Sequence, residues 1–137
     1  MTEVNSSPVP AISAHGGARF LNRQALGLAL TTLVAVTVVL TTLMPSAYVP
    51  GPPGGDKTMH LLAFAALTLP TAFLAHRHLT WVLPFAIVLG AAIEIIQPAF
   101  GRHRELADLY ADSAGALAGV GVGLMCRALL GRLGLMT

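Results

Sequence analysis

The sequence has little charge: only 10% of its 137 residues are Asp, Glu, Lys or Arg, whereas 55% are apolar. A soluble domain carries roughly 25% charged residues, and a short chain needs many polar residues because its surface is large relative to its volume. The scarcity of charge therefore argues against a soluble globular protein. Intrinsic disorder is excluded as well, because it requires low hydrophobicity and high net charge. The composition indicates an integral membrane protein.

Cysteine and clustered basic residues are also scarce. Cys126 is the single cysteine, so this sequence forms no intramolecular disulfide and no cysteine-rich zinc site. It lies in an apolar stretch and is interpreted as a packing residue. The net charge is +2, and the basic residues are spread thinly, whereas a protein that binds nucleic acid gathers them on one face. No nucleic-acid partner is expected.

Four apolar runs are long enough to cross the bilayer core, which takes about 20 helical residues. They cover residues 25–44, 58–75, 79–98 and 106–130. The first run exceeds the length of a signal-peptide core and is interpreted as an uncleaved signal anchor. Pro70 is expected to kink the second run, and Pro98 is expected to end the third. The predicted fold is all-α: four transmembrane helices in a compact bundle.

The segments outside these runs are short. Residues 1–18 are rich in Ser, Pro and Gly and are predicted to form a flexible cytoplasmic tail, so residues 19–137 form a single membrane domain. Lys and Arg favour cytoplasmic loops. With both termini in the cytoplasm, more of these residues lie inside than outside, which supports that orientation. The inner set is Arg19, Arg23, Arg77, Arg127 and Arg132, and the outer set is Lys57, Arg102 and Arg104.

Ionisable residues gather at the outer ends of three spans. Charge within a membrane span is expensive and usually functional. Asp56 and His60, and likewise Asp108 and Asp112, are four residues apart and share a helix face. Glu94 lies near a helix C-terminus, where the helix dipole disfavours negative charge, so it needs a cation, a metal or a proton nearby. Convergence of these groups at one membrane level is the main functional signal in the sequence.

Glycines at four-residue spacing follow Asp112 in the fourth run, at positions 115, 119 and 123. Stripes of small residues let membrane helices approach closely. The face that carries Asp112 is therefore predicted to pack against a neighbouring helix rather than lipid.

Four short motifs, in this order, resemble the VanZ-like family of small membrane proteins. They are D-K-T-M-H (Asp56–His60), E-I-I-Q (Glu94–Gln97), G-R (Gly101–Arg102) and D-L-Y-A-D-S-A-G (Asp108–Gly115). The resemblance covers about half of the chain and implies a protein of the bacterial plasma membrane. It also implies action in the cell envelope, with a link to resistance to the glycopeptide teicoplanin. The family more often has Asn where this sequence has Asp112.

One hypothesis is a small membrane enzyme that acts on an envelope lipid or a lipid-linked cell-wall precursor. Glu94 would be the general acid or base, His60 the second proton-transfer group, and Asp108 an orienting group. Lys57 and Arg102 would hold a phosphate or carboxylate of the substrate. The predicted substrate-binding set is Asp56, Lys57, Gln97, Arg102 and Asp112.

The sequence does not identify a cofactor. His60, Glu94 and Asp108, with or without Asp112, have side chains that bind divalent metals. However, the sequence contains no compact ligand run such as H-E-x-x-H. No metal ligands are therefore predicted, and the metal hypothesis remains an alternative.

Two further hypotheses are non-catalytic. The charged set can form an ion-pair network that locks the helix ends and binds a lipid head group or a drug, since membrane charges usually pair with one another. A small transporter or channel, as an oligomer, is the third alternative. It is disfavoured because a path for ions should show charges at several depths, whereas here they occur on one side. A homo-oligomer is left open.

Overall fold

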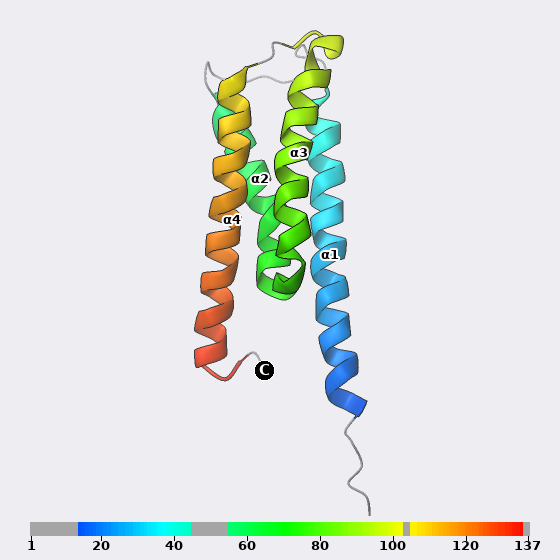
Figure 1. Cartoon of the computed structure of the whole chain (residues 1–137), viewed down its shortest axis with the longest axis vertical. Helices are drawn as coiled ribbons and strands as arrows, with labels where there is room; N and C mark the ends of the chain where they lie inside the picture. Colours follow the sequence, from blue (N-terminus) through cyan, green and yellow to red (C-terminus); the bar gives the residue numbers. More distant parts are fainter. Residues whose placement is uncertain (1–13, 45–54, 103–104, 136–137) are drawn as a thin grey trace, which may run out of the picture.

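The computed structural model describes residues 14–44, 55–102 and 105–135, with side chains from Asn22 onward in the first range. Figure 1 shows a bundle in which successive helices run in opposite directions. Each of the four helices contains a segment long and apolar enough to cross a membrane, which confirms the predicted all-α membrane fold. The elements are α1 (Ala14–Thr42), α2 (Gly55–Leu74), η2 (His76–His78), α3 (Leu79–Ile96), η3 (Gln97–Phe100) and α4 (Leu106–Arg132).

The first helix extends further than predicted toward the N-terminus. It begins at Ala14, within the segment that was expected to be a flexible tail, whereas residues 1–13 lie outside the described part of the chain. Extending an existing helix adds one backbone hydrogen bond per residue without a new nucleation cost. The apolar span that follows therefore continues into the preceding residues despite their two glycines.

Prolines have different effects in the second and third spans. Pro70 lies inside α2, which continues as a helix to Leu74. The ring removes the N–H that would bond to the carbonyl of Ala66, and the kink expected there stays a prediction. Regular helix in the third span ends at Ile96, and Pro98 lies in the short 3-10 turn η3 that follows. The predicted stop at Pro98 therefore falls close to the observed end.

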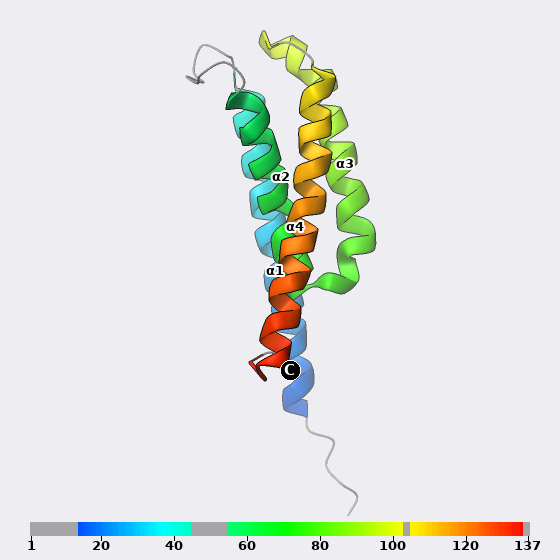
Figure 2. The same cartoon turned by 90° about the vertical axis from the view of Figure 1, so that its left-hand side faces the viewer.

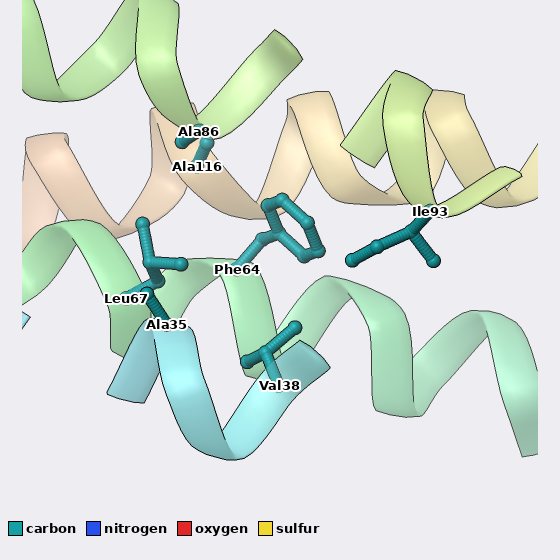
Figure 3. Close-up of a cluster of buried hydrophobic side chains, with 7 residues drawn as sticks. All are labelled: Ala35, Val38, Phe64, Leu67, Ala86, Ile93 and Ala116. Carbon is teal, nitrogen blue, oxygen red and sulfur yellow. The ribbon is translucent and has the colours of Figure 1, made fainter. Parts of the chain in front are cut away.

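The central helix of the bundle is α2, which packs against all three other helices and most extensively against α4 (Figures 1 and 2). Its Phe64 and Leu67 are completely buried and form the middle of the apolar core. Every helix contributes to this core, so the four helices form one packed unit. Figure 3 shows Phe64 and Leu67 with Ala35 and Val38 of α1, Ala86 and Ile93 of α3, and Ala116 of α4.

The glycine stripe of α4 lies directly against α2. Gly115, Gly119 and Gly123 are buried, and an added Cβ at Gly115 or Gly119 would collide with the carbonyl oxygen of Leu61 or Ala65. The helix backbones therefore come closer here than any side chain allows. This arrangement confirms the predicted role of the small residues in helix packing.

Buried threonines of α2 add hydrogen bonds between helices. The Thr68 hydroxyl donates to the carbonyl oxygen of Ala116 in α4 at 2.8 Å, and the hydroxyls of Thr31 and Thr71 share a bond of 2.8 Å between α1 and α2. Such bonds in membrane proteins average about 0.6 kcal/mol each. Their main contribution is to fix the rotation of α2 relative to its neighbours.

Two glycine substitutions on α4 are expected to have opposite effects. Gly115→Ala places a methyl group against the carbonyl of Leu61 and should lower the free energy of unfolding by about 1–3 kcal/mol, as overpacking does. Gly121→Ala is the matched control, since its Cβ meets nothing within 4 Å and alanine favours helix by about 1 kcal/mol over glycine. Thermal unfolding of the two detergent-solubilised variants tests this. Equal stability of the two variants would contradict the close contact of α2 and α4.

Candidate functional site

The ionisable residues predicted to converge do lie together, at the end of the bundle where α3 ends and α2 and α4 begin (Figure 1). The alternating direction of the helices brings these segments to one level. Hydrogen bonds, ion pairs or short ligand-atom distances link the group, which is called the polar cluster below. Its members are Asp56, Lys57, His60, Glu94, Glu105, Asp108 and Asp112.

A histidine and an aspartate form the buried centre of the polar cluster. His60 Nδ1 of α2 lies 2.9 Å from Asp112 Oδ1 of α4, and the two side chains are 3% and 0% exposed. The partner of His60 is therefore Asp112, not Asp56 on its own helix. Asp112, predicted to bind substrate, thus contacts His60, whereas Asp108, predicted to orient one of the functional side chains, lies 3.9 Å from Lys57 Nζ. The buried imidazole thus has a fixed partner through Nδ1.

Gly90 of α3 makes room for this pair. A Cβ at Gly90 would lie 2.7 Å from Asp112 Oδ2, so any larger residue would press on the carboxylate. Asp112 Oδ2 has no hydrogen-bond partner within the described residues. The sequence analysis did not identify Gly90, because a single glycine in an apolar run gives no indication of what it faces.

Glu94 is buried beside the histidine, with 3% of its surface exposed. Its Oε2 accepts a hydrogen bond of 3.0 Å from the backbone N–H of Glu105, the residue that precedes α4. The carboxylate therefore lies at the N-terminal end of α4, where the helix dipole favours negative charge. This contact offsets the unfavourable position near the C-terminus of α3. Its other oxygen, Oε1, has no hydrogen-bond partner in the part of the chain that the structure describes.

Lys57 forms the exposed rim of the polar cluster. Its Nζ lies 2.7 Å from Glu105 Oε2 and 3.9 Å from both Asp56 Oδ1 and Asp108 Oδ1. Lys57, Asp56 and Glu105 are all more than one-third exposed, whereas Asp108 is buried. Exposed ion pairs of this kind contribute about 0–1 kcal/mol to stability. The cluster thus runs continuously from an exposed cation to a buried His–Asp pair.

Two predicted substrate-binding residues lie outside this network. Gln97 is buried, but its Nε2 donates to the carbonyl oxygen of Thr42 at 3.2 Å, which ties η3 to the end of α1. Arg102 is half-buried and forms no ion pair with any described side chain. Glu105, which the sequence placed only in a turn, instead contacts both Lys57 and Glu94. Arg104, assigned to the outer set, lies outside the described residues.

Carboxylates outnumber cations in the polar cluster. Only Lys57 and, when protonated, His60 supply positive charge. Burying a carboxylate without a partner is costly, so the buried acids favour binding of a cation or a proton. The arrangement can therefore exchange protons, hold a positive ion, or bind a polar group that enters past Lys57. The acids are Asp56, Glu94, Glu105, Asp108 and Asp112.

Comparison with known proteins finds no matching family model, no matching curated protein and no matching solved structure. The resemblance to the VanZ-like family therefore depends on the four sequence motifs alone.

The contact between His60 and Asp112 predicts a graded effect of substitutions at position 112. Asp112→Ala removes the acceptor and leaves a buried imidazole nitrogen unpaired, which should cost about 1–3 kcal/mol of stability. Asp112→Asn keeps an acceptor oxygen and should cost less. Ser113→Ala is the control, because among the described residues the Ser113 hydroxyl donates only to the carbonyl oxygen of Leu109 in its own helix. Thermal unfolding in detergent would rank the variants, and an Asn variant as unstable as the Ala variant would show that the charge itself is required.

Proposed function

We propose that the chain is a VanZ-like protein of the bacterial plasma membrane whose polar cluster binds the head group of an envelope lipid or a lipid-linked cell-wall precursor. The observation that supports this is the placement of the cluster. It lies at one end of the bundle and links an exposed lysine to a buried His–Asp pair. The central parts of all four spans, by contrast, contain no Asp, Glu, Lys or Arg.

Apolar side chains beside the cluster fit a lipid ligand. Met59 next to His60, and Leu106 next to Glu105, are each about two-thirds exposed. Exposed apolar surface on a membrane helix faces lipid tails, so an amphipathic ligand can keep its chains there while its head group reaches Lys57. The lysine ammonium is a suitable partner for a phosphate or carboxylate oxygen.

A catalytic variant of this function is favoured by one contact. Asp112 holds the buried His60 imidazole, and Glu94 lies beside it. A carboxylate that orients a histidine next to a second acid is the arrangement used for general acid–base chemistry. In this alternative Glu94 and His60 transfer protons at the substrate, and Asp112 positions His60.

Teicoplanin susceptibility tests the envelope function. A sensitive host that expresses the wild-type chain should be protected, whereas Glu94→Gln and His60→Ala should fall to the level of the host without the chain. His76→Ala, which changes a histidine at the opposite end of the bundle, should still protect. Each variant is quantified in the membrane fraction. Abundant wild-type protein without any protection would exclude this role in teicoplanin resistance.

Lipid profiling of the same cells separates binding from catalysis. A binding protein should leave the envelope lipids unchanged in amount and co-purify with one of them. An enzyme should deplete one lipid or precursor and accumulate its product, and Glu94→Gln should reverse that change while the protein stays in the membrane.

The proposed orientation, with both termini in the cytoplasm, is supported by the excess of Lys and Arg on that side. A green fluorescent protein fused to the C-terminus should therefore fluoresce. Alkaline phosphatase fused at the same position should be inactive, because it requires the oxidising outer side. Active phosphatase with a dark fluorescent fusion would reverse the orientation and place the polar cluster on the cytoplasmic side.

A further inference from the structure

We propose that His60, Glu94 and Asp108 bind a divalent transition-metal ion, a site that goes beyond the proposed head-group binding. The three residues come from three different helices, α2, α3 and α4. One ligand atom from each lies within 4.8 Å of the other two. This convergence is a property of the folded bundle, because the residues are far apart in the sequence and form no local ligand motif.

Burial and missing partners distinguish these residues from an ordinary acidic patch. All three side chains are buried. Glu94 Oε1 and Asp108 Oδ1 have no hydrogen-bond partner within the described chain, and the nearest ammonium to Asp108, that of Lys57, stands 3.9 Å away. A buried carboxylate oxygen without a partner is strongly unfavourable. A cation between the ligand atoms would satisfy both carboxylates at once.

The donor set indicates the class of ion. Imidazole suits Zn²⁺, Fe²⁺ and Ni²⁺, whereas Mg²⁺, Ca²⁺ and Mn²⁺ prefer oxygen ligands. Three protein ligands leave a coordination position open for another molecule, as in catalytic zinc sites. The ion would thus be held firmly and still be able to contact a ligand.

Asp112 supports the site without being one of its ligands. It holds His60 through Nδ1 at 2.9 Å, which leaves Nε2 as the ring nitrogen for the metal. Metal-binding histidines usually have their second nitrogen bonded to a carboxylate in this way, which fixes the ring and raises its basicity. In the metal site, Asp112 therefore fixes the orientation of the His60 ring and raises its basicity.

A second acidic group beside this site fits an ion less well. Asp56, Glu105 and Asp108 also bring ligand atoms within 4.8 Å, but the side chains of Asp56 and Glu105 are more than one-third exposed. Lys57 already lies among them, 2.7 Å from Glu105. A metal there would compete with the ammonium group and would have no imidazole ligand. The metal site is therefore assigned to His60, Glu94 and Asp108, called the inner group. Asp56, Glu105 and Asp108, called the outer group, are the alternative site, and the experiment must distinguish the two.

A bound ion would also change what the polar cluster attracts. The cluster is rich in acids, whereas phosphate head groups are negative. A divalent ion in its interior gives phosphate oxygens a positive centre, as metals do in phosphoryl-transfer sites. This use of the ion rests on the proposed head-group binding, whereas the metal site itself does not.

Direct titration tests the site. The full-length protein, stripped with chelator and placed in nanodiscs of neutral phosphatidylcholine, is titrated with Zn²⁺ and Ni²⁺ by calorimetry. We expect about one ion per chain. His60→Ala, Glu94→Gln and Asp108→Asn should each weaken binding at least about tenfold, which is the smallest effect typical of supporting residues around metals. His76→Ala, at the opposite end of the bundle, is the control and should bind as the wild type does, whereas Glu105→Gln tests the outer group and should weaken binding less than the three ligand variants do.

Each outcome decides the question. Loss of binding in Glu105→Gln together with normal binding in His60→Ala would move the ion to the outer group, and no binding by the wild type would overturn the site altogether. Circular dichroism and size-exclusion chromatography establish that the variants fold. If a variant fails to fold, X-ray absorption of the Zn²⁺-loaded wild type still tests the proposal, because it must show an imidazole ligand. No envelope precursor or drug is present, so this result is independent of the susceptibility assay.

Discussion

Because no side chain separates α2 from α4 at Gly115 and Gly119, the two helix backbones meet directly. That approach lets Thr68 reach the carbonyl of Ala116. It also brings His60 of α2 within hydrogen-bonding distance of Asp112 on α4. The same contact therefore supports the packing of the bundle and the buried centre of the polar cluster.

The polar cluster combines interactions of very different energetic weight. The pair of Lys57 and Glu105 is exposed and contributes little to stability. The pair of His60 and Asp112 is buried, so removing one partner is expensive even though the intact pair adds little net stability. Apolar packing around Phe64 and Leu67 must offset the cost of burying these groups. Such an arrangement is typical of a functional site rather than of a device for stability.

The fold and the end of the bundle that holds the site could be predicted from the sequence. In lipid every backbone polar group must be bonded internally, so the length and hydropathy of four runs suffice to predict four helices. Short connections then force alternate directions, which bring Lys57, Glu94 and Asp108 to one end. The start of α1 at Ala14 was not predicted. Composition identifies the polar N-terminal segment, but it does not show how far the helix of the first span extends into that segment.

The contacts within the cluster could not be predicted. Helical spacing placed Asp56 and His60 on one face, but the partner of His60 depends on how α4 is rotated and how closely it approaches. Both depend on glycine packing that involves Leu61 and Ala65 on another helix. Gly90 provides room for Asp112, and the backbone N–H of Glu105 bonds to Glu94. Neither a glycine nor a backbone amide adds to the charge pattern of the sequence. A main-chain donor leaves no signature in a sequence.

The hydrogen bond from the Glu105 backbone to Glu94 connects the polar cluster with the start of α4. The Glu105 amide hydrogen is held by the Glu94 carboxylate, so its exchange with solvent depends on the state of that carboxylate. A proton or an ion that takes electron density from Glu94 loosens this amide. The exchange rate of the Glu105 amide hydrogen therefore reports on the charge of the buried Glu94 carboxylate.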